Sequence, residues 1–377
     1  MPVPKCPACN EKMVRNGRTA AGTQRWKCMS CKATSANRID SAAKRLDEFL
    51  GWLLSKKRMA DMPGQGRTFR RRTAEFWSIW PMPPLVDEVH RVVYVDGIHL
   101  GRRAVVLIAC TDDHVLGWYL ARQENARARS ALMARIAPPL MVVTDGGTGF
   151  AKACREQWPQ TEVQRCVFHA YCQVRRYTTS RPRLQAGAEL LGLATELLHV
   201  GDEGAAAEWL ARYFRWCERW DGFLAEVTEV DGRRELTHCR LVKARASLNR
   251  LISTNHLFTY LDEWLTLDGP MPKTNNRIEG GVNAPLRQML REHRGMSLVR
   301  RIKAIYWWWC YMHTECRLGA ADILRTMPTD DDIDEIYGSL RKKDEPAGII
   351  PQWGDAVMWS DLHMIDYSHD SFRHDWD

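Results

Sequence analysis

The chain has 377 residues, of which 45% are hydrophobic, and its formal net charge is +8. This length predicts two or three domains, and this apolar content is sufficient for a buried core. No apolar run approaches the roughly 18 residues of a membrane span, and the chain begins with Pro, Lys and paired Cys rather than with a signal-peptide pattern. We therefore expect a cytoplasmic protein whose cysteines serve metal binding or burial rather than disulfides.

The charge is distributed unevenly along the chain. Residues 1–80 hold 17 Lys and Arg against 6 Asp and Glu, whereas residues 330–377 hold 4 against 13. A basic amino-terminal part combined with an acidic tail indicates a nucleic acid partner. Ordinary solvated charge is the alternative interpretation.

Residues 1–38 contain two Cys-x-x-Cys pairs separated by 18 residues, namely Cys6 with Cys9 and Cys28 with Cys31. This spacing is typical of a tetrahedral zinc site made of four thiolates. The segment is too short and polar to fold around a core, so the metal would supply the free energy of folding. The sequence therefore predicts a zinc ribbon with a structural Zn²⁺, and a redox dithiol is the alternative.

Residues 39–84 are predicted to form a helix-turn-helix region and a proline-rich linker. Apolar residues recur along one helical face, at Leu46, Phe49, Leu50, Leu53 and Leu54. A Pro-Gly-Gln-Gly sequence then interrupts the chain, and Thr68 can cap a second helix. Two helices of which the second is basic are typical of a DNA reader, and a solvated basic helix is the alternative.

Residues 85–179 change to a strand-rich pattern. The apolar runs predict strands and helices in the order β-β-β-α-β-α-β, with strands at 91–96, 103–111, 114–121, 140–144 and 161–167 and helices at 126–136 and 149–158. Three antiparallel strands followed by parallel ones is the order of an RNase H-like core. The fold class that we predict is therefore α/β.

The rest of the chain is predicted to be mostly helical. Residues 180–268 are amphipathic and indicate an all-α insertion in the core. Residues 269–328 return to the core with a helix around Glu279 and a basic helix. The acidic tail, residues 329–377, has no clear period, and we expect it to be loosely ordered.

Three acidic residues are the strongest catalytic candidates. Asp96 and Asp145 each end an apolar run, and Glu279 lies in a helix-like segment far downstream. An aspartate after a strand is commonly a turn former, but the predicted strand order makes Asp96 and Asp145 neighbours. Two Mg²⁺ or Mn²⁺ ions bind oxygen ligands and can clamp the attacking and leaving oxygens of a phosphodiester displacement.

Glycines accompany all three acids. Gly97, Gly146 and Gly147 follow the aspartates and leave room for a phosphate or backbone to approach. Gly280 and Gly281 directly follow Glu279 and cost a helix about 1 kcal/mol each relative to Ala. A helix that accepts them beside an acid needs either close packing or the approach of a substrate.

Cys166 and His169 follow the fifth predicted strand. Two further ligands at standard spacing, which a metal site would need, are not evident. A buried cysteine with a hydrogen-bonded histidine is one interpretation, and a role in ordering the active site is the other.

Several cations are candidates for contacts with DNA phosphates. Two of them flank Trp26, three directly follow Phe69, and the others lie downstream of Glu279. The candidates are Arg25, Lys27, Arg70, Arg71, Arg72, Arg287, Arg291, Arg294, Arg300 and Arg301.

With these residues the chain resembles the Mutator-like DDE transposases of bacterial insertion sequences. The resemblance covers about residues 85–315, and the zinc ribbon is similar to that of one subgroup. The sequences that carry it are Val95-Asp96-Gly97, Thr144-Asp145-Gly146, Cys166-x-x-His169, and Asn276-x-x-Glu279 with Asn283.

The resemblance implies that Asp96, Asp145 and Glu279 bind two Mg²⁺ or Mn²⁺, with Cys166, His169, Asn276 and Asn283 in support. It also implies a dimer or larger assembly on double-stranded DNA, which binds the terminal inverted repeats of the insertion sequence and the target DNA. The protein would be bacterial and associated with the nucleoid. Cleavage would use water, and strand transfer would use a DNA 3′-OH. A DNA-binding regulator derived from a transposase and an RNase H-like nuclease without joining activity remain alternatives.

Overall fold

In the computed structural model the chain consists of two compact units. The first unit comprises Met1–Ile79 with Leu318–Met327, and the second comprises Trp80–Arg317 with Pro328–Asp377. The structure describes residues 3–6, 8–36, 42–83, 85–147, 149–314 and 318–341. Most of the predicted acidic tail, residues 342–377, therefore lies outside the described residues.

The first unit begins with a small antiparallel sheet in the order β1-β2-β3, made of β1 (Met13–Arg18), β2 (Gln24–Cys28) and β3 (Thr34–Ser35). Met13 and Trp26 are buried against Cys6 and Cys28, and Ala33 packs against this small cluster among the described residues. So small a core is insufficient to hold a fold by itself, as expected for a segment that depends on a metal.

The first unit also contains three short α-helices, which are α1 (Ala42–Leu53), α2 (Arg67–Thr73) and α12 (Ala320–Thr326), and two 3₁₀ turns at Met59–Asp61 and Ala74–Ser78. The predicted apolar face of α1 is confirmed, with Trp52 buried instead of Leu54. The ring of Phe49 contacts Phe76 and Trp77 at centroid distances of 5.8 and 5.0 Å.

Two details of the predicted helix-turn-helix are wrong. The second helix begins after Gly66, which has a φ of 80°, and not after Thr68. A Cβ at Gly66 would collide with Met59, so the turn needs glycine both for its backbone conformation and for its close packing. Residues 54–66, which connect the helices, also form a longer link than the three- or four-residue turn of that motif.

The second unit is built on a five-stranded mixed sheet, as the sequence predicts. Its strands are β4 (Val92–Leu100), β5 (Ala104–Cys110), β6 (Val115–Ala121), β7 (Met141–Thr144) and β8 (Glu162–Arg165). They are arranged in the order β6-β5-β4-β7-β8, in which β5 is antiparallel to both of its neighbours and β4, β7 and β8 are parallel.

The position of Asp96 in β4 differs from the prediction, because the strand does not end there. β4 continues to Leu100 and pairs with β5 along this whole length. Its pairing with β7 stops at Val95, opposite Thr144. Asp96 is therefore a buried residue inside a strand, at the level where the parallel neighbour ends.

The two faces of the sheet are covered by different elements. On one face α3 (Ala126–Met133) and α4 (Phe150–Gln157) pack against Val93 and Val95. Because side chains alternate along a strand, Asp96 points to the other face. That face packs on α11 (Leu298–Trp308) and the π-helical segment Trp309–His313, where Trp118 of β6 contacts Tyr306 and Trp309 at ring distances of 5.7 and 5.9 Å.

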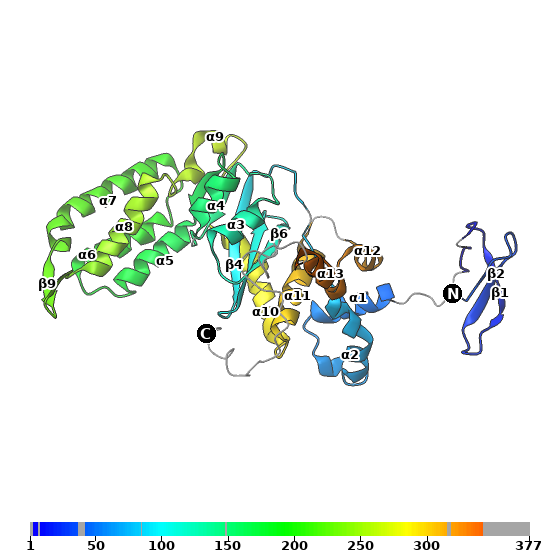
Figure 1. Cartoon of the computed structure of the whole chain (residues 1–377). Helices are drawn as coiled ribbons and strands as arrows, with labels where there is room; N and C mark the ends of the chain where they lie inside the picture. Colours follow the sequence, from blue (N-terminus) through cyan, green and yellow to red (C-terminus); the bar gives the residue numbers. More distant parts are fainter. Residues whose placement is uncertain are drawn as a thin grey trace. The chain divides into compact units, whose positions relative to one another are not determined.

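A helical region follows β8, and the prediction that it is all-α is wrong in one respect. Neighbouring helices pack side by side in it (Figure 1): α5 (Val167–Thr178), α6 (Gln185–Leu197), α7 (Glu203–Leu224) and α8 (Cys239–Ser253). Between α7 and α8 lies an antiparallel hairpin of β9 (Val227–Val230) and β10 (Arg233–Leu236). Its turn at Asp231 and Gly232 takes positive φ angles, which favours a hairpin over a continuous helix.

The chain then returns to the sheet through short helical elements. They are a 3₁₀ turn at Thr259–Leu261, α9 (Glu263–Thr266), the π-helical segment Arg277–Asn283, α10 (Ala284–Glu292) and α13 (Asp330–Arg341). Among the helices that the structure describes, none is both long enough and apolar enough to cross a membrane.

The predicted tail begins with the helix α13, contrary to the prediction that it is loosely ordered from residue 329. Asp330 at the start of α13 accepts hydrogen bonds from Lys303 Nζ and Trp80 Nε1, each at 2.7 Å. The Lys303 ammonium also lies 4.4 Å from the Trp80 ring centroid. Burial lowers the pKa of Lys303 to about 8, and Asp330 opposes this effect.

We expect Asp330→Ala to lower the free energy of unfolding by about 2 kcal/mol, because it removes the carboxylate that neutralises a buried ammonium. Combining it with Lys303→Met should recover part of this loss. Urea unfolding measures both effects. The matched control is Asp331→Ala, an exposed acid on the same helix, and an equal loss in the control would contradict the role of the Lys303–Asp330 pair.

Candidate functional site

The four amino-terminal cysteines come together as the sequence predicts. Their sulfur atoms all lie within 4.8 Å of one another, with Cys6 to Cys31 at 3.5 Å and Cys9 to Cys28 at 3.4 Å. A hydrogen bond from the Cys31 backbone lowers the pKa of Cys28 to about 7, whereas hydrogen bonds with the Cys28 and Cys31 sulfurs raise the pKa of Cys9 to about 12. Since the thiolate is the form that binds zinc, this cluster could hold a structural Zn²⁺.

Two cations of β2, Arg25 and Lys27, lie on the face opposite the cluster. Trp26 is buried beside the cysteines, while Arg25 is exposed and Lys27 is partly exposed. The alternation along β2 thus has a packing reason. The two cations are available to solvent, and their contact with DNA stays a prediction.

Asp96 is held by a residue from the far end of the sequence. Asn283 Nδ2 donates a hydrogen bond of 2.8 Å to Asp96 Oδ2. Burial raises the pKa of Asp96, as do the nearby charges of Asp145 and Glu279, whereas the backbone N–H of Gly97 and the guanidinium of Arg287 lower it. Asn283 Oδ1 is buried and has no hydrogen-bond partner among the described residues.

Asp145 is positioned by the end of β7 and by a buried arginine. Because Val95 pairs with Thr144, Asp145 follows on the strand next to Asp96. Its Oδ1 accepts the backbone N–H of Gly147 at 3.0 Å and lies 3.8 Å from Arg129 Nη2.

Arg129 was not among the predicted site residues, although its side chain is fully buried and also contacts Glu124. The available signal was its place on α3 four residues before Met133, on the face that the helix buries. A charged residue on such a face needs an acidic partner.

The glycines after Asp145 do not leave open space, which corrects their predicted role. A Cβ on Gly146 would overlap the guanidinium of Arg165, and a Cβ on Gly147 would overlap that of Arg129. Both arginines act electrostatically on Asp145. These glycines therefore let two cations approach the carboxylate, in place of the predicted phosphate or backbone.

Glu279 lies in the π-helical segment Arg277–Asn283 and contacts His169. The distance from His169 Nε2 to Glu279 Oε1 is 3.2 Å. The adjacent Cys166 is buried, its sulfur accepts the backbone N–H of Asn275 at 3.4 Å, and it contributes most to the raised pKa of His169. Cys166 and His169 thus connect the start of α5 to the segment around Glu279. Single π-helical turns such as this one are frequent at functional sites.

The three acids are near enough to act on one another electrostatically, but they are not closed around an ion. Within the described part of the chain, the four cysteines are the only group of three or more His, Cys, Asp or Glu whose ligand atoms all lie within 4.8 Å. The donor chemistry of the acids fits Mg²⁺, which binds through one or two carboxylates and keeps several waters. The unpartnered Asn283 Oδ1 is one further oxygen beside Asp96.

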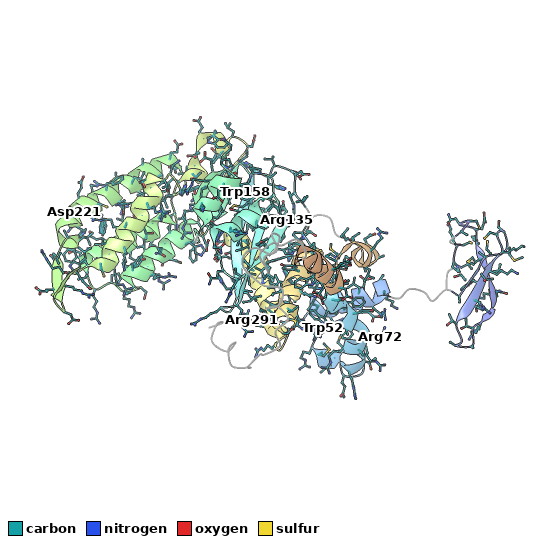
Figure 2. The ribbon with its side chains drawn as sticks, viewed as in Figure 1. Trp52, Arg72, Arg135, Trp158, Asp221 and Arg291 are labelled. Atoms are coloured by element: carbon teal, nitrogen blue, oxygen red, sulfur yellow. The ribbon has the colours of Figure 1, made fainter. Side chains whose placement is uncertain are left out.

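The remaining predicted residues are dispersed. Asn276 is exposed and lines a groove together with Arg277. Arg287 of α10 acts electrostatically on Asp96, while Arg291, labelled on α10 in Figure 2, is exposed like Arg294. Arg300 and Arg301 lie in the first turn of α11.

In the first unit, the three adjacent arginines of α2 are exposed. Arg70 donates to the backbone carbonyl of Gly66, and Arg72 forms an ion pair with Glu48 at 3.4 Å. The charge of Arg72 is therefore partly neutralised. A DNA-binding role for these arginines stays a prediction.

Comparison of the chain with known protein families finds no matching family, and comparison with curated protein sequences finds no match.

We expect the purified chain to contain one Zn²⁺, and Cys28→Ser to lose it and to expose residues 3–36 to protease, because the small apolar cluster cannot hold the ribbon without metal. Metal released to a chromogenic chelator and limited proteolysis measure the two effects. Cys239→Ser, which changes an exposed thiol outside the cluster, is the control. A zinc content unchanged by Cys28→Ser would contradict the site.

We also expect Asp96→Asn to stabilise the metal-free protein at neutral pH. The folded state raises the pKa of Asp96, so its ionised form destabilises the fold above that pKa, and this cost disappears as the pH falls below the ordinary value of about 4. Asparagine keeps an oxygen acceptor for Asn283. The variant should be more stable than the wild type at pH 7, and the difference should vanish near pH 3, as thermal unfolding without added Mg²⁺ or Mn²⁺ measures. A loss of stability at pH 7 would contradict the assigned electrostatics.

Proposed function

We propose that this chain is a DNA transposase of the DDE type, which cleaves and joins DNA strands with divalent metal ions. The observation that carries the proposal is the gathering of Asp96, Asp145 and Glu279 from distant parts of the sequence near the end of the β4–β7 pair. Acidic side chains whose pKa values are shifted by burial and by neighbouring charges are frequent at functional sites.

The order of the sheet supports the proposal. Three antiparallel strands followed by two parallel ones, with Asp96 on the central strand, is the arrangement expected of an RNase H-like core. We propose this classification for the sheet domain, with the region from α5 to α8 as its insertion. The insertion separates Asp145 from Glu279 in sequence.

Each proposed ligand has its own partner. Asp96, Asp145 and Glu279 would hold two Mg²⁺ or Mn²⁺, which when bound supply charge stabilisation to the attacking and leaving oxygens. Asn283 orients Asp96, and His169 orients Glu279. Such partners set the direction of ligand side chains before the substrate arrives.

We assign recognition of the DNA ends of the insertion sequence to the first unit and to the cations that follow Glu279. The four-cysteine sheet and α2 carry exposed Arg25, Arg70 and Arg71, and α10 carries Arg287 and Arg291. Phosphate contacts of this kind give an affinity that falls steeply with salt. We propose that two or more copies assemble on paired DNA ends and on the target.

The test uses the full chain and a labelled duplex that carries the DNA flanking its coding gene. With Mg²⁺ the wild type should cleave and join this DNA. Asp96→Asn, Asp145→Asn and Glu279→Gln should each lower the rate by roughly a thousandfold, about 4 kcal/mol of transition-state stabilisation, and should keep DNA binding. Gel separation of the products and a binding titration measure the two properties.

Glu208→Gln is the control, since it removes one exposed acidic charge from α7. Cleavage retained by any of the three variants would exclude that residue from the site. Wild-type binding without cleavage would favour a DNA-binding regulator, and cleavage without joining would favour a nuclease.

A further inference from the structure

An open groove lies beside the segment that carries Glu279. Its volume is about 530 Å³, and its lining includes Tyr94 of β4, Met271, Arg277, Gly280 and Gly281. This volume falls within the range of roughly 300–1,000 Å³ that is usual for ligand sites. Tyr94 is two residues before Asp96 and on the same side of β4, so the groove adjoins the proposed metal-binding acids.

The two glycines of the groove have no structural reason to be glycine. Neither has a positive φ angle among the described backbone conformations. A Cβ added to Gly280 or Gly281 would meet no described protein atom within 4 Å. Each glycine nevertheless costs a helix about 1 kcal/mol relative to Ala. The same holds for Gly192 in α6 and Gly222 in α7, so what distinguishes Gly280 and Gly281 is their place in the lining of the groove.

The polar wall of the groove is held in place by a shared carboxylate. Asp112 accepts a hydrogen bond from Tyr94 Oη at 2.9 Å and one from Arg277 Nε at 3.2 Å. The Arg277 side chain is about 61% exposed, so its guanidinium remains accessible while one edge is fixed. Asp112 also belongs to the lining of the groove, whereas Arg287, which acts electrostatically on Asp96, is not part of it. A phosphate-bearing chain complements such a surface.

We propose that this groove binds the sugar–phosphate backbone of the DNA strand that adjoins the scissile phosphodiester. Gly280 and Gly281 let the strand lie directly against the helix backbone, and Arg277 contacts a phosphate. This inference rests on the proposed function, because it places the scissile group at Asp96 and Glu279. The contacts are to the backbone of the strand, so they carry no preference for base sequence.

The experiment compares Gly280→Leu and Gly281→Leu with the matched variants Gly192→Leu in α6 and Gly222→Leu in α7. All four glycines are exposed and helical, and a Cβ at each meets nothing within 4 Å. Leucine favours a helix over glycine. All four variants should therefore keep or raise the melting temperature of the full chain.

The binding probe is a fluorescein-labelled, mixed-sequence oligonucleotide, single-stranded and as a duplex, in Ca²⁺ so that no strand is cut. We expect the Gly280 and Gly281 variants to bind the single strand about tenfold more weakly or worse, a change of roughly 1.4 kcal/mol, while the Gly192 and Gly222 variants bind like the wild type. Arg277→Gln should weaken binding and lessen its dependence on salt.

Unchanged binding by the Gly280 and Gly281 variants would overturn the groove as a DNA site. A large drop in their melting temperature would overturn it too, because packing would then explain the glycines. If the wild type cleaves DNA and these variants bind and cleave like it, the groove assignment fails while the transposase proposal stands. If the wild type neither binds nor cleaves any DNA, the proposed function itself fails.

Discussion

The candidate site depends above all on the register in which β7 pairs with β4. Val95 pairs with Thr144, so Asp96 and Asp145 come next on neighbouring strands. A shift of one residue would turn Asp96 toward α3 and α4, because successive side chains point to opposite faces. The packing of Val93 and Val95 against those helices fixes the register, and the apolar core thereby determines where the carboxylates lie.

The same region balances a local excess of negative charge. Burial and two neighbouring acids raise the pKa of Asp96, and the fold offsets this with groups from other elements. Arg129 reaches Asp145 from α3, and His169 reaches Glu279 from α5. Asp145 and Glu279 are thus each paired with a group from another element. A divalent ion would complete the charge balance, which is why the metal-free state is expected to gain stability when Asp96 is neutralised.

Much of this protein could be predicted from local patterns. The strand order follows from short apolar runs, and the four-cysteine cluster follows from two Cys-x-x-Cys pairs, since ligand spacing is itself a local property. The details that failed were those in which distant segments take part. Asp96 was expected at a strand end because the apolar residues before it do not reveal the pairing of β4 with β5. The tail was expected to be loosely ordered because Lys303, which binds Asp330, lies in another helix.

The sequence by itself determined most of the strands and helices and the cysteine cluster, and it singled out Asp96, Asp145 and Glu279 as candidates. The tertiary structure alone decided which group contacts each acid, because these contacts join residues that are distant in sequence. Asn283 contacts Asp96, Arg129 contacts Asp145, and His169 contacts Glu279. It also decided the meaning of the glycines. Those after Asp145 make room for buried cations, while those after Glu279 border an open groove. Spacing along a chain cannot distinguish these cases, since only the packed fold shows whether the space beside a glycine is filled.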